Sequence, residues 1–254
     1  MTETAPTIVN AEGQHPVVLV CEHASAFIPA SLNNLGIDAA AASSHIAWDP
    51  GAVEVARHLS RSLDAVLIEA NVSRLVYDCN RPPEAPDAMP ARSEIYTIPG
   101  NADLSSLQRQ QRVDQYYRPF ERLVRDTLSA HAVPPVLVTV HSFTPVYNGV
   151  ARDLEVGILH NRDARLADAI LRVAKELDVQ RNQPYGPDDG VMHTLKLHAE
   201  PSGFLNVMIE VRNDLIASAS ACEAMAVHLQ RWLVDAMSVL AADAAAANSG
   251  SVCQ

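Results

Sequence analysis

Two histidines directly follow apolar, β-branched segments of the sequence. His23 comes just after residues 17–21, and His141 comes just after residues 136–140. In open α/β sheets, ligands bind outside the carboxyl ends of the strands. A single histidine in such a place is more often a hydrogen-bonding residue of the fold than a ligand. Two of them at equivalent strand ends, with acids nearby, favour a metal site.

The expected metal is zinc. A hydrolytic zinc site has three His, Asp or Glu ligands and one open position for water. His23 and His141 supply two ligands, and Asp49 and Asp78 are the candidates for the third. Zinc would lower the pKa of the water and polarise a substrate carbonyl, although other divalent ions can occupy such a site. Glu22, beside His23, is either an orienting residue or an alternative ligand.

A further carboxylate, Glu210, lies inside the apolar run of residues 207–211. A buried acid must be paired or functional, because burying an unpaired charge is costly. An ion pair with Arg212 is the structural alternative, and the two side chains would share a face of the strand. A carboxylate that does not bind the metal can serve as the general base. Arginines held in fixed positions can bind a substrate carboxylate through two hydrogen bonds.

The elements that must position these residues alternate along the chain. Short, continuous apolar runs predict buried strands, and apolar residues at helical spacing predict helices between them. The strands are expected at residues 17–21, 65–68, 136–140, 154–159 and 207–211, and the helices at 50–63, 103–131, 163–177 and 217–242. This order predicts an α/β fold with helices on both faces of the sheet.

The length of 254 residues fits one large α/β domain, and no linker or repeat divides it. We expect a single domain over residues 15–243, a flexible N-terminus over 1–14 and a flexible, Ala/Ser/Gly-rich tail over 244–254. With no signal peptide or apolar span in the sequence, the expected location is the cytoplasm. Four cysteines without a CxxC pair predict reduced thiols.

The net charge of −11 argues against nucleic acid or an anionic membrane as a partner. The sequence also lacks the GxSxG motif of serine hydrolases and a glycine-rich phosphate loop. The expected partner is therefore a small molecule, and the oligomeric state stays open.

Six local patterns, taken in order, resemble the N-formylglutamate amidohydrolase family over residues 16–235. They are Cys-Glu-His-Ala-Ser at 21–25, His-Ile-Ala-Trp-Asp-Pro-Gly-Ala at 45–52, Asn-Val-Ser-Arg-Leu-Val-Tyr-Asp-Cys-Asn-Arg at 71–81, His-Ser-Phe-Thr-Pro at 141–145, Leu-Lys-Leu-His-Ala at 195–199 and Ile-Glu-Val-Arg-Asn-Asp at 209–214. The resemblance implies a mixed, mostly parallel sheet like that of zinc carboxypeptidases and aspartoacylases. It also implies an enzyme of amino acid metabolism that releases formate or another small acid from an N-acyl amino acid.

The resemblance also implies roles for single residues. The metal ligands would be His23, Asp49 and His141, and Glu210 would be the catalytic glutamate. By the same resemblance, Arg74 would bind the substrate or the oxyanion, and the substrate-binding residues would be Asn80, Arg81 and His198. Arg212 would hold a second carboxylate or orient Glu210.

The first pattern departs from the family, whose histidine-degrading members usually have Pro-His-Ser/Ala-Gly where this chain has Glu22-His23-Ala24-Ser25. The chain therefore resembles a divergent branch, and N-formyl-L-glutamate is one candidate substrate among N-acyl amino acids. Two other functions are weighed beside this one. The first is a carboxylate-binding protein without catalysis, and the second is an amidase that uses Cys21 with His23 as a nucleophile.

Overall fold

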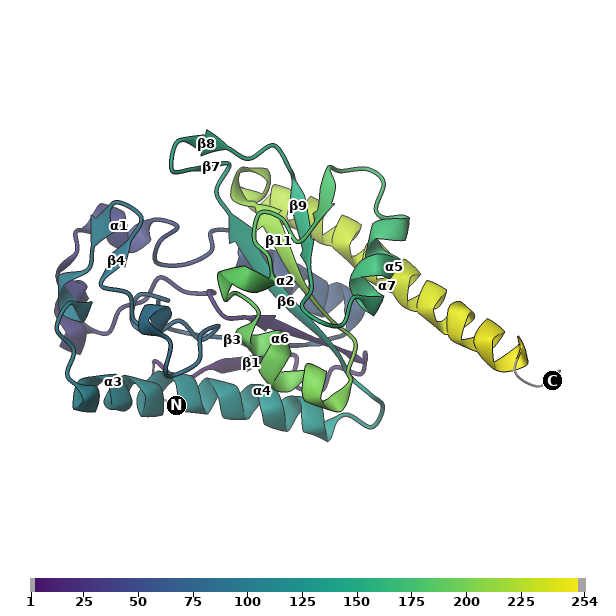
Figure 1. Cartoon of the computed structure of the whole chain (residues 1–254), viewed down its shortest axis with the longest axis horizontal. Helices are drawn as coiled ribbons and strands as arrows, with labels where there is room; N and C mark the ends of the chain where they lie inside the picture. The colour runs from purple at the N-terminus through teal and green to yellow at the C-terminus, as the bar shows by residue number, and fades with distance from the viewer. Residues whose placement is uncertain (1–2, 251–254) are drawn as a thin grey trace.

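A seven-stranded mixed sheet forms the centre of the molecule (Figure 1). The computed structural model describes residues 3–250, and the side chains of residues 3–247. The strands, in chain order, are β1 (Thr7–Val9), β2 (Val17–Cys21), β3 (Val66–Glu69), β6 (Val136–Phe143), β9 (Val156–Leu159), β10 (Val179–Arg181) and β11 (Asn206–Arg212). Their order across the sheet is β1-β3-β2-β6-β11-β9-β10. Strands β3, β2, β6 and β11 run parallel, whereas β1 and β9 are antiparallel to their inner neighbours.

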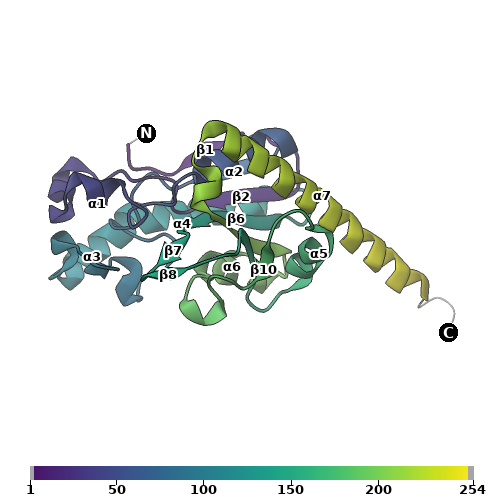
Figure 2. The same ribbon diagram turned by 90° about the horizontal axis from the view of Figure 1, so that it is seen from above.

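Helices cover both faces of this sheet, as the alternation of patterns predicted. Helices α2 (Ala52–Leu63), α5 (Arg165–Val173) and α7 (Ala219–Gly250) pack on one face, where α2 and α7 lie side by side (Figure 2). The other face is covered by α4 (Arg118–Ala130) and α6 (His193–His198). Alternate residues of β2 point to opposite faces of the sheet. Leu19 packs on the side of α2, α5 and α7, and Val20 packs on the side of α4 and α6. The continuous apolar strands are therefore buried on both sides.

Smaller elements build the loops around the sheet. Two short hairpins are β4 (Arg92–Ser93) with β5 (Tyr96–Thr97), and β7 (Val146–Tyr147) with β8 (Val150–Ala151). The remaining short helices are α1 (Ala39–Ser43), η1 (Ala30–Gly36), η2 (Pro86–Ala88), η3 (Pro99–Asn101), η5 (Pro187–Asp189), η6 (Glu200–Ser202) and η7 (Asn213–Ile216). No helix within residues 3–250 is long and apolar enough to cross a membrane.

The structure departs from the sequence-based predictions most clearly at four places. The helix expected at 103–131 consists of α3 (Ser106–Arg112), a π-helical turn η4 (Val113–Tyr117) and α4 in succession. Strand β6 continues to Phe143, so His141 lies inside the strand and not after it. Within the segment expected to be a flexible N-terminus, Thr7–Val9 forms a strand that pairs with β3. At the other end α7 continues as a helix to Gly250, beyond the predicted domain end at 243, and residues 251–254 lie outside the described part.

The turn that enters α2 fixes the position of the preceding acid, Asp49. Gly51 caps the helix with a φ of +83°, a conformation that side chains disfavour. A Cβ at Gly51 would also lie 2.5 Å from the backbone oxygen of Ile216, in η7. The backbone of Asp49 itself donates to the backbone oxygen of His23 over 3.0 Å. Close packing of this turn therefore holds Asp49 beside the end of β2.

Candidate metal centre

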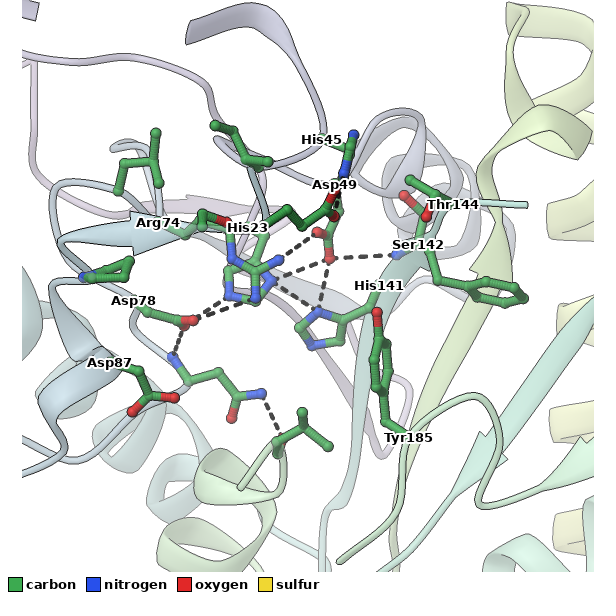
Figure 3. Close-up of a pocket in the computed structure, with 18 of the residues that line it drawn as sticks. His23, His45, Asp49, Arg74, Asp78, Asp87, His141, Ser142, Thr144 and Tyr185 are labelled. Carbon is green, nitrogen blue, oxygen red and sulfur yellow. Dashed lines mark hydrogen bonds and ion pairs between the residues drawn. The ribbon is translucent and has the colours of Figure 1, made fainter. Parts of the chain in front are cut away.

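A cavity of about 330 Å³ opens at the carboxyl ends of β2, β6 and β11 (Figure 3). Ligands of open α/β sheets bind at this end of the strands. The cavity lining brings together most of the predicted residues, namely His23, Asp49, Arg74, Asp78, Asn80, Arg81, His141 and Glu210. These residues come from segments far apart in the chain, and the parallel strands bring them to one edge of the sheet.

Three ligand atoms converge inside this cavity. Nδ1 of His23 lies 3.1 Å from Oδ2 of Asp49, and Nδ1 of His141 lies 2.9 Å from the same oxygen. The two Nδ1 atoms are 3.2 Å apart. Ligand atoms bound at 2.0–2.1 Å around a tetrahedral zinc ion are about 3.3 Å from one another, so the three are close to a metal-binding spacing. All three side chains are buried, and together they could hold a metal ion.

Carboxylates also stand at the far side of both imidazole rings. Nε2 of His23 lies 2.7 Å from Oδ1 of Asp78. Nε2 of His141 lies 3.1 Å from Oε2 of Glu22, an ion pair without hydrogen-bond geometry. A carboxylate beside Nε2 favours the proton on that nitrogen and leaves a lone pair on Nδ1. With both rings neutral, the two lone pairs and the carboxylate oxygen face one another, and a proton or a metal cation between them would relieve their repulsion.

These contacts separate the roles that the sequence left open. Asp49, and not Asp78, contributes its oxygen to the converging group. Glu22 is buried, and its ion pair is with His141 and not with its neighbour His23. Burial opposes a charge on His141, yet Glu22 and Asp49 overcome it and hold the pKa of His141 well above its usual value. The site is thus built to favour positive charge at its centre.

Arg74 spans two of the acids at the rim of this group. Its Nη1 donates to Oδ1 of Asp49 over 3.1 Å, and its Nη2 donates to Oδ2 of Asp78 over 3.3 Å. Burial works to raise the pKa of Asp78, but His23 and Arg74 hold it well below its usual value. Both carboxylates are therefore ionised at neutral pH. The guanidinium lies at the cavity wall, within reach of a bound small molecule.

Glu210 lies opposite His141 in the pairing of β11 with β6. It is 5% exposed, and its Oε2 makes no hydrogen bond with any described residue. Burial raises the pKa of Glu210 to about 7, and the nearby Asp49 adds to the shift. A carboxylate with a pKa near neutrality that does not belong to the converging group has the properties of a general base.

Asn80 and Arg81 line the cavity from the loop that follows Asp78. The Asn80 amide donates to the backbone oxygen of Val191 over 2.6 Å, and its oxygen accepts from the backbone of Thr194. The Arg81 guanidinium donates to Asp87 and, over 3.1 Å, to the backbone oxygen of Gly190. Both side chains thus tie two loops together at the cavity wall, and their role in substrate binding stays a prediction.

Two predicted substrate contacts lie elsewhere in the structure. His198 lines a second, smaller cavity of about 180 Å³ together with residues of α4, such as Glu121 and Arg125. It faces away because α6 presents it to α4 and not to the sheet edge. Arg212 does not line the first cavity either. Its Nη1 donates to the backbone oxygen of Asp153 over 2.7 Å and its Nε to Asp214, so it stabilises the chain before β9.

The sequence reasoning did not assign two neighbours of the site. Tyr185 lines the cavity from the loop after β10. Arg152, after β8, donates from Nη1 to the Tyr185 hydroxyl over 3.2 Å. Neither residue follows a predicted strand end, so the rule that found the histidines had no reason to select them.

Cys21 does not line the cavity, and its side chain is fully buried. Burial, with the nearby Asp49, raises the pKa of the Cys21 thiol well above its usual value. A thiol in this state is a poor nucleophile, which argues against the cysteine amidase. Cys79 and Cys222 are also buried and free, and Cys253 lies outside the described residues.

Metal-dependent hydrolases use sites of this kind, in which a His-Asp-His group can hold a metal ion and a further carboxylate lies beside it. Here the group is buried at the edge of a mixed sheet in an α/β fold. Residues 15–217 match the family model described as N-formylglutamate amidohydrolase. The chain belongs to this family, whose name describes hydrolysis of an amide bond.

Two solved structures are similar to the chain over most of its length. A gene product of Agrobacterium tumefaciens is 52% identical, with a TM-score of 0.91 over 93% of this chain and 96% of the other. An N-formylglutamate amidohydrolase from Ralstonia eutropha is 18% identical, with a TM-score of 0.60 over 94% of this chain and 99% of the other. The second comparison shows a shared fold. None of the curated proteins compared with the chain matches it.

Proposed function

We propose that this protein is a zinc-dependent amidohydrolase that cleaves the amide bond of a small N-acyl amino acid, with N-formyl-L-glutamate as the first candidate. The single observation that carries the proposal is the convergence of Nδ1 of His23, Nδ1 of His141 and Oδ2 of Asp49 within 3.2 Å of one another, beside the unpaired Glu210. Membership of the family supports the reaction class.

The residues present fit zinc. Two imidazole nitrogens and one carboxylate oxygen form a three-ligand set of the kind that catalytic zinc sites use, with a fourth position left for water or substrate. When bound, zinc lowers the pKa of a bound water towards about 7 and polarises the carbonyl under attack. Asp78 and Glu22 would hold the two imidazoles in the orientation that presents Nδ1.

In the proposed reaction, Glu210 accepts a proton from the attacking water as the oxygen of that water bonds to the acyl carbon. Glu210 then delivers this proton to the amide nitrogen, the C–N bond breaks, and a carboxylic acid and an amine leave. Its pKa of about 7 suits both steps, because the group can take and return a proton near neutral pH. Arg74 would stabilise the negative charge that develops on the carbonyl oxygen.

The guanidinium of Arg81 would bind the carboxylate of the substrate. The protein as a whole carries a charge of −11, so an anionic substrate needs local positive charge. In the cavity this charge would come from the zinc ion and from the guanidiniums of Arg74, Arg81 and Arg92, which lie beside the acids of the lining. Arg74 contacts Asp49, so a substrate carboxylate held by Arg81 and Arg92 would leave the acyl group beside Arg74 and the converging ligands.

The first experiment measures metal content and activity together. Elemental analysis of the purified protein is expected to give about one zinc per chain, and formate release from N-formyl-L-glutamate is expected to stop with a chelator and return with zinc. Zinc without formate release would keep the reaction class and move the search to other N-acyl amino acids. Binding of these compounds without any turnover would favour a carboxylate-binding protein. A protein that takes up no zinc would contradict the proposal.

Substitution Glu210→Gln tests the base. It preserves the size of the side chain but removes its ability to accept a proton, so kcat should fall by about 100-fold or more, as general-base catalysis contributes 10²–10⁴. Zinc content should stay at the wild-type value, because Glu210 is outside the converging group. Near-normal turnover by the zinc-loaded variant would exclude Glu210 as the base.

A further inference from the structure

The Tyr185 hydroxyl accepts a hydrogen bond from Arg152. Nη1 of Arg152 lies 3.2 Å from it, and a guanidinium carries donors alone, so the phenol oxygen is the acceptor. The proton of the hydroxyl is then left to donate. Within residues 3–250 this hydroxyl donates no hydrogen bond to another residue. The cavity that Tyr185 lines is the space in which an acceptor can bind.

Aromatic rings hold Arg152 in its place. Its guanidinium carbon lies 4.5 Å from the ring centroid of Tyr147, 5.0 Å from that of Tyr185 and 5.8 Å from that of Phe143. These are cation–π distances. No carboxylate forms an ion pair with Arg152 in the described part of the chain. A cation that donates to the phenol oxygen polarises the O–H bond and strengthens the phenol as a donor.

Charged residues around the cavity act on the Tyr185 phenol. Burial raises the pKa of Tyr185, and the negative charge of Glu210 raises it further, against the positive charges of Arg152 and Arg74. The hydroxyl therefore keeps its proton at neutral pH and lies within the fields of Glu210 and Arg74. In Figure 3 its hydroxyl end is closer to His141 than its backbone end is. The donor thus lies at the side of the cavity where the acyl group would react.

We propose that Tyr185 is a further catalytic residue, whose hydroxyl donates a hydrogen bond to the oxygen of the scissile carbonyl as negative charge develops on that oxygen. Arg152 is a positioning residue that holds and polarises this donor. Tyr185 keeps its proton throughout, and no bond to it forms or breaks. The inference rests on the proposed function and adds to it a second donor, across the cavity from Arg74.

Substitution Tyr185→Phe removes the hydroxyl and keeps the ring that packs on Arg152. We expect kcat for N-formyl-L-glutamate to fall about 100-fold, since one lost donor to an oxyanion costs 10²–10³. The KM and the zinc content should stay close to their wild-type values, because the interaction strengthens in the transition state. Tyr96→Phe is the matched control, since Tyr96 in β5 is outside the cavity lining and should keep full activity.

Arg152→Gln tests the positioning role. It should lower kcat in the wild-type background and have little effect in the Tyr185→Phe background, because the two residues act through one hydroxyl. A rise in KM of the same size in both backgrounds would show that Arg152 binds the substrate carboxylate directly, and would overturn its assigned role. An unchanged kcat in zinc-loaded Tyr185→Phe would overturn the proposal for Tyr185.

Binding provides a readout that does not depend on turnover. The probe is a phosphinate analogue of N-formyl-L-glutamate, in which tetrahedral phosphorus replaces the formyl carbon and a methylene replaces the amide nitrogen. By calorimetry, Tyr185→Phe should weaken its binding about as much as it lowers kcat/KM, and should leave L-glutamate binding unchanged. Equal losses for both ligands would contradict the proposal. If the wild-type enzyme hydrolyses no N-acyl amino acid, the proposed function fails and this inference fails with it.

Discussion

Glu22 and Asp78 stand in the same relation to two different histidines. Each places a carboxylate oxygen near the Nε2 atom of an imidazole whose Nδ1 points to the centre of the site, at 3.1 Å for Glu22 and 2.7 Å for Asp78. The residue that departs from the family pattern, Glu22, therefore has a physical role. It balances the charge at His141 as Asp78 does at His23.

At this scale we predict that Glu22→Gln and Asp78→Asn each weaken zinc binding by about 10–100-fold, since both remove the charge that orients a ligand histidine. Equilibrium dialysis against a competing chelator measures the affinity. Asp87→Asn is the control, because Asp87 also lines the cavity but pairs with Arg81 and contacts no ligand. An affinity that is unchanged in both variants, or lowered equally in the control, would contradict the assigned roles.

Two arginines that the sequence treated alike have different surroundings. Arg81 lines the cavity, whereas Arg212 binds backbone oxygens before β9. We predict that Arg81→Ala raises KM about 10-fold or more with a smaller change in kcat, as hydrogen bonds to a charged group contribute about 1.5–3 kcal/mol. Arg212→Ala should lower the free energy of unfolding and leave KM unchanged. Steady-state kinetics and urea denaturation on both variants test this, and the opposite pattern would exchange the two roles.

At the scale of elements, the loop after β10 carries Tyr185 to the cavity because it runs close to β9. Gly157 in β9 makes this approach possible, since a Cβ there would overlap the backbone oxygen of Gln183. Gly157 also pairs with Glu210 in the register of β9 with β11. Because Gly157 has no side chain, the loop that carries Tyr185 can pack against β9, next to the strand that carries Glu210.

We predict that Gly157→Ala lowers the free energy of unfolding by about 1–3 kcal/mol, because backbone must move to make room for the added methyl. Chemical denaturation of the zinc-loaded protein measures the change. The control is Gly186→Ala in the same loop, where the nearest atom to a Cβ lies 3.8 Å away and φ is −133°. Equal free energies of unfolding for the two variants would show that the loop can move without loss of stability, and would contradict the prediction.

At the scale of the molecule, the three ligands come from three separate parts of the chain. His23 follows β2, Asp49 precedes α2, and His141 lies in β6. They meet in the folded state alone, so a metal that binds them stabilises the fold as a whole. The long helix α7 packs on the same face of the sheet as α2, and its C-terminal part extends beyond the sheet (Figure 1).

Metal removal should therefore lower thermal stability. Zinc at 100 times its Kd adds about 2.7 kcal/mol, which for a chain of this size shifts Tm by about 5–10 °C. Calorimetry with and without a chelator measures the shift. His23→Ala should abolish it, whereas His198→Ala should retain it because His198 lines the other cavity. A shift that persists in His23→Ala would indicate zinc binding elsewhere.

The features that depend on local pattern could be predicted from the sequence. Continuous β-branched runs predicted the central strands, because strands buried on both faces have no polar side. The same logic found His23, His141 and Glu210, since a polar residue at the end of such a run must lie at the sheet edge or pair inside it. The residue pattern left Asp49 and Asp78 as candidates for the third ligand, and the family resemblance favoured Asp49.

Which residues meet across the site could not be predicted in this way, because it depends on the packing of the folded chain. Asp49 and Asp78 are equivalent in the sequence, but the turn at Gly51 brings only Asp49 between the two Nδ1 atoms. Helix α6 places His198 against α4, and Arg212 donates to backbone oxygens and does not line the cavity. Tyr185 reaches the site from a distant loop. Such contacts depend on how loops pack against one another, which periodicity and spacing along the chain do not encode.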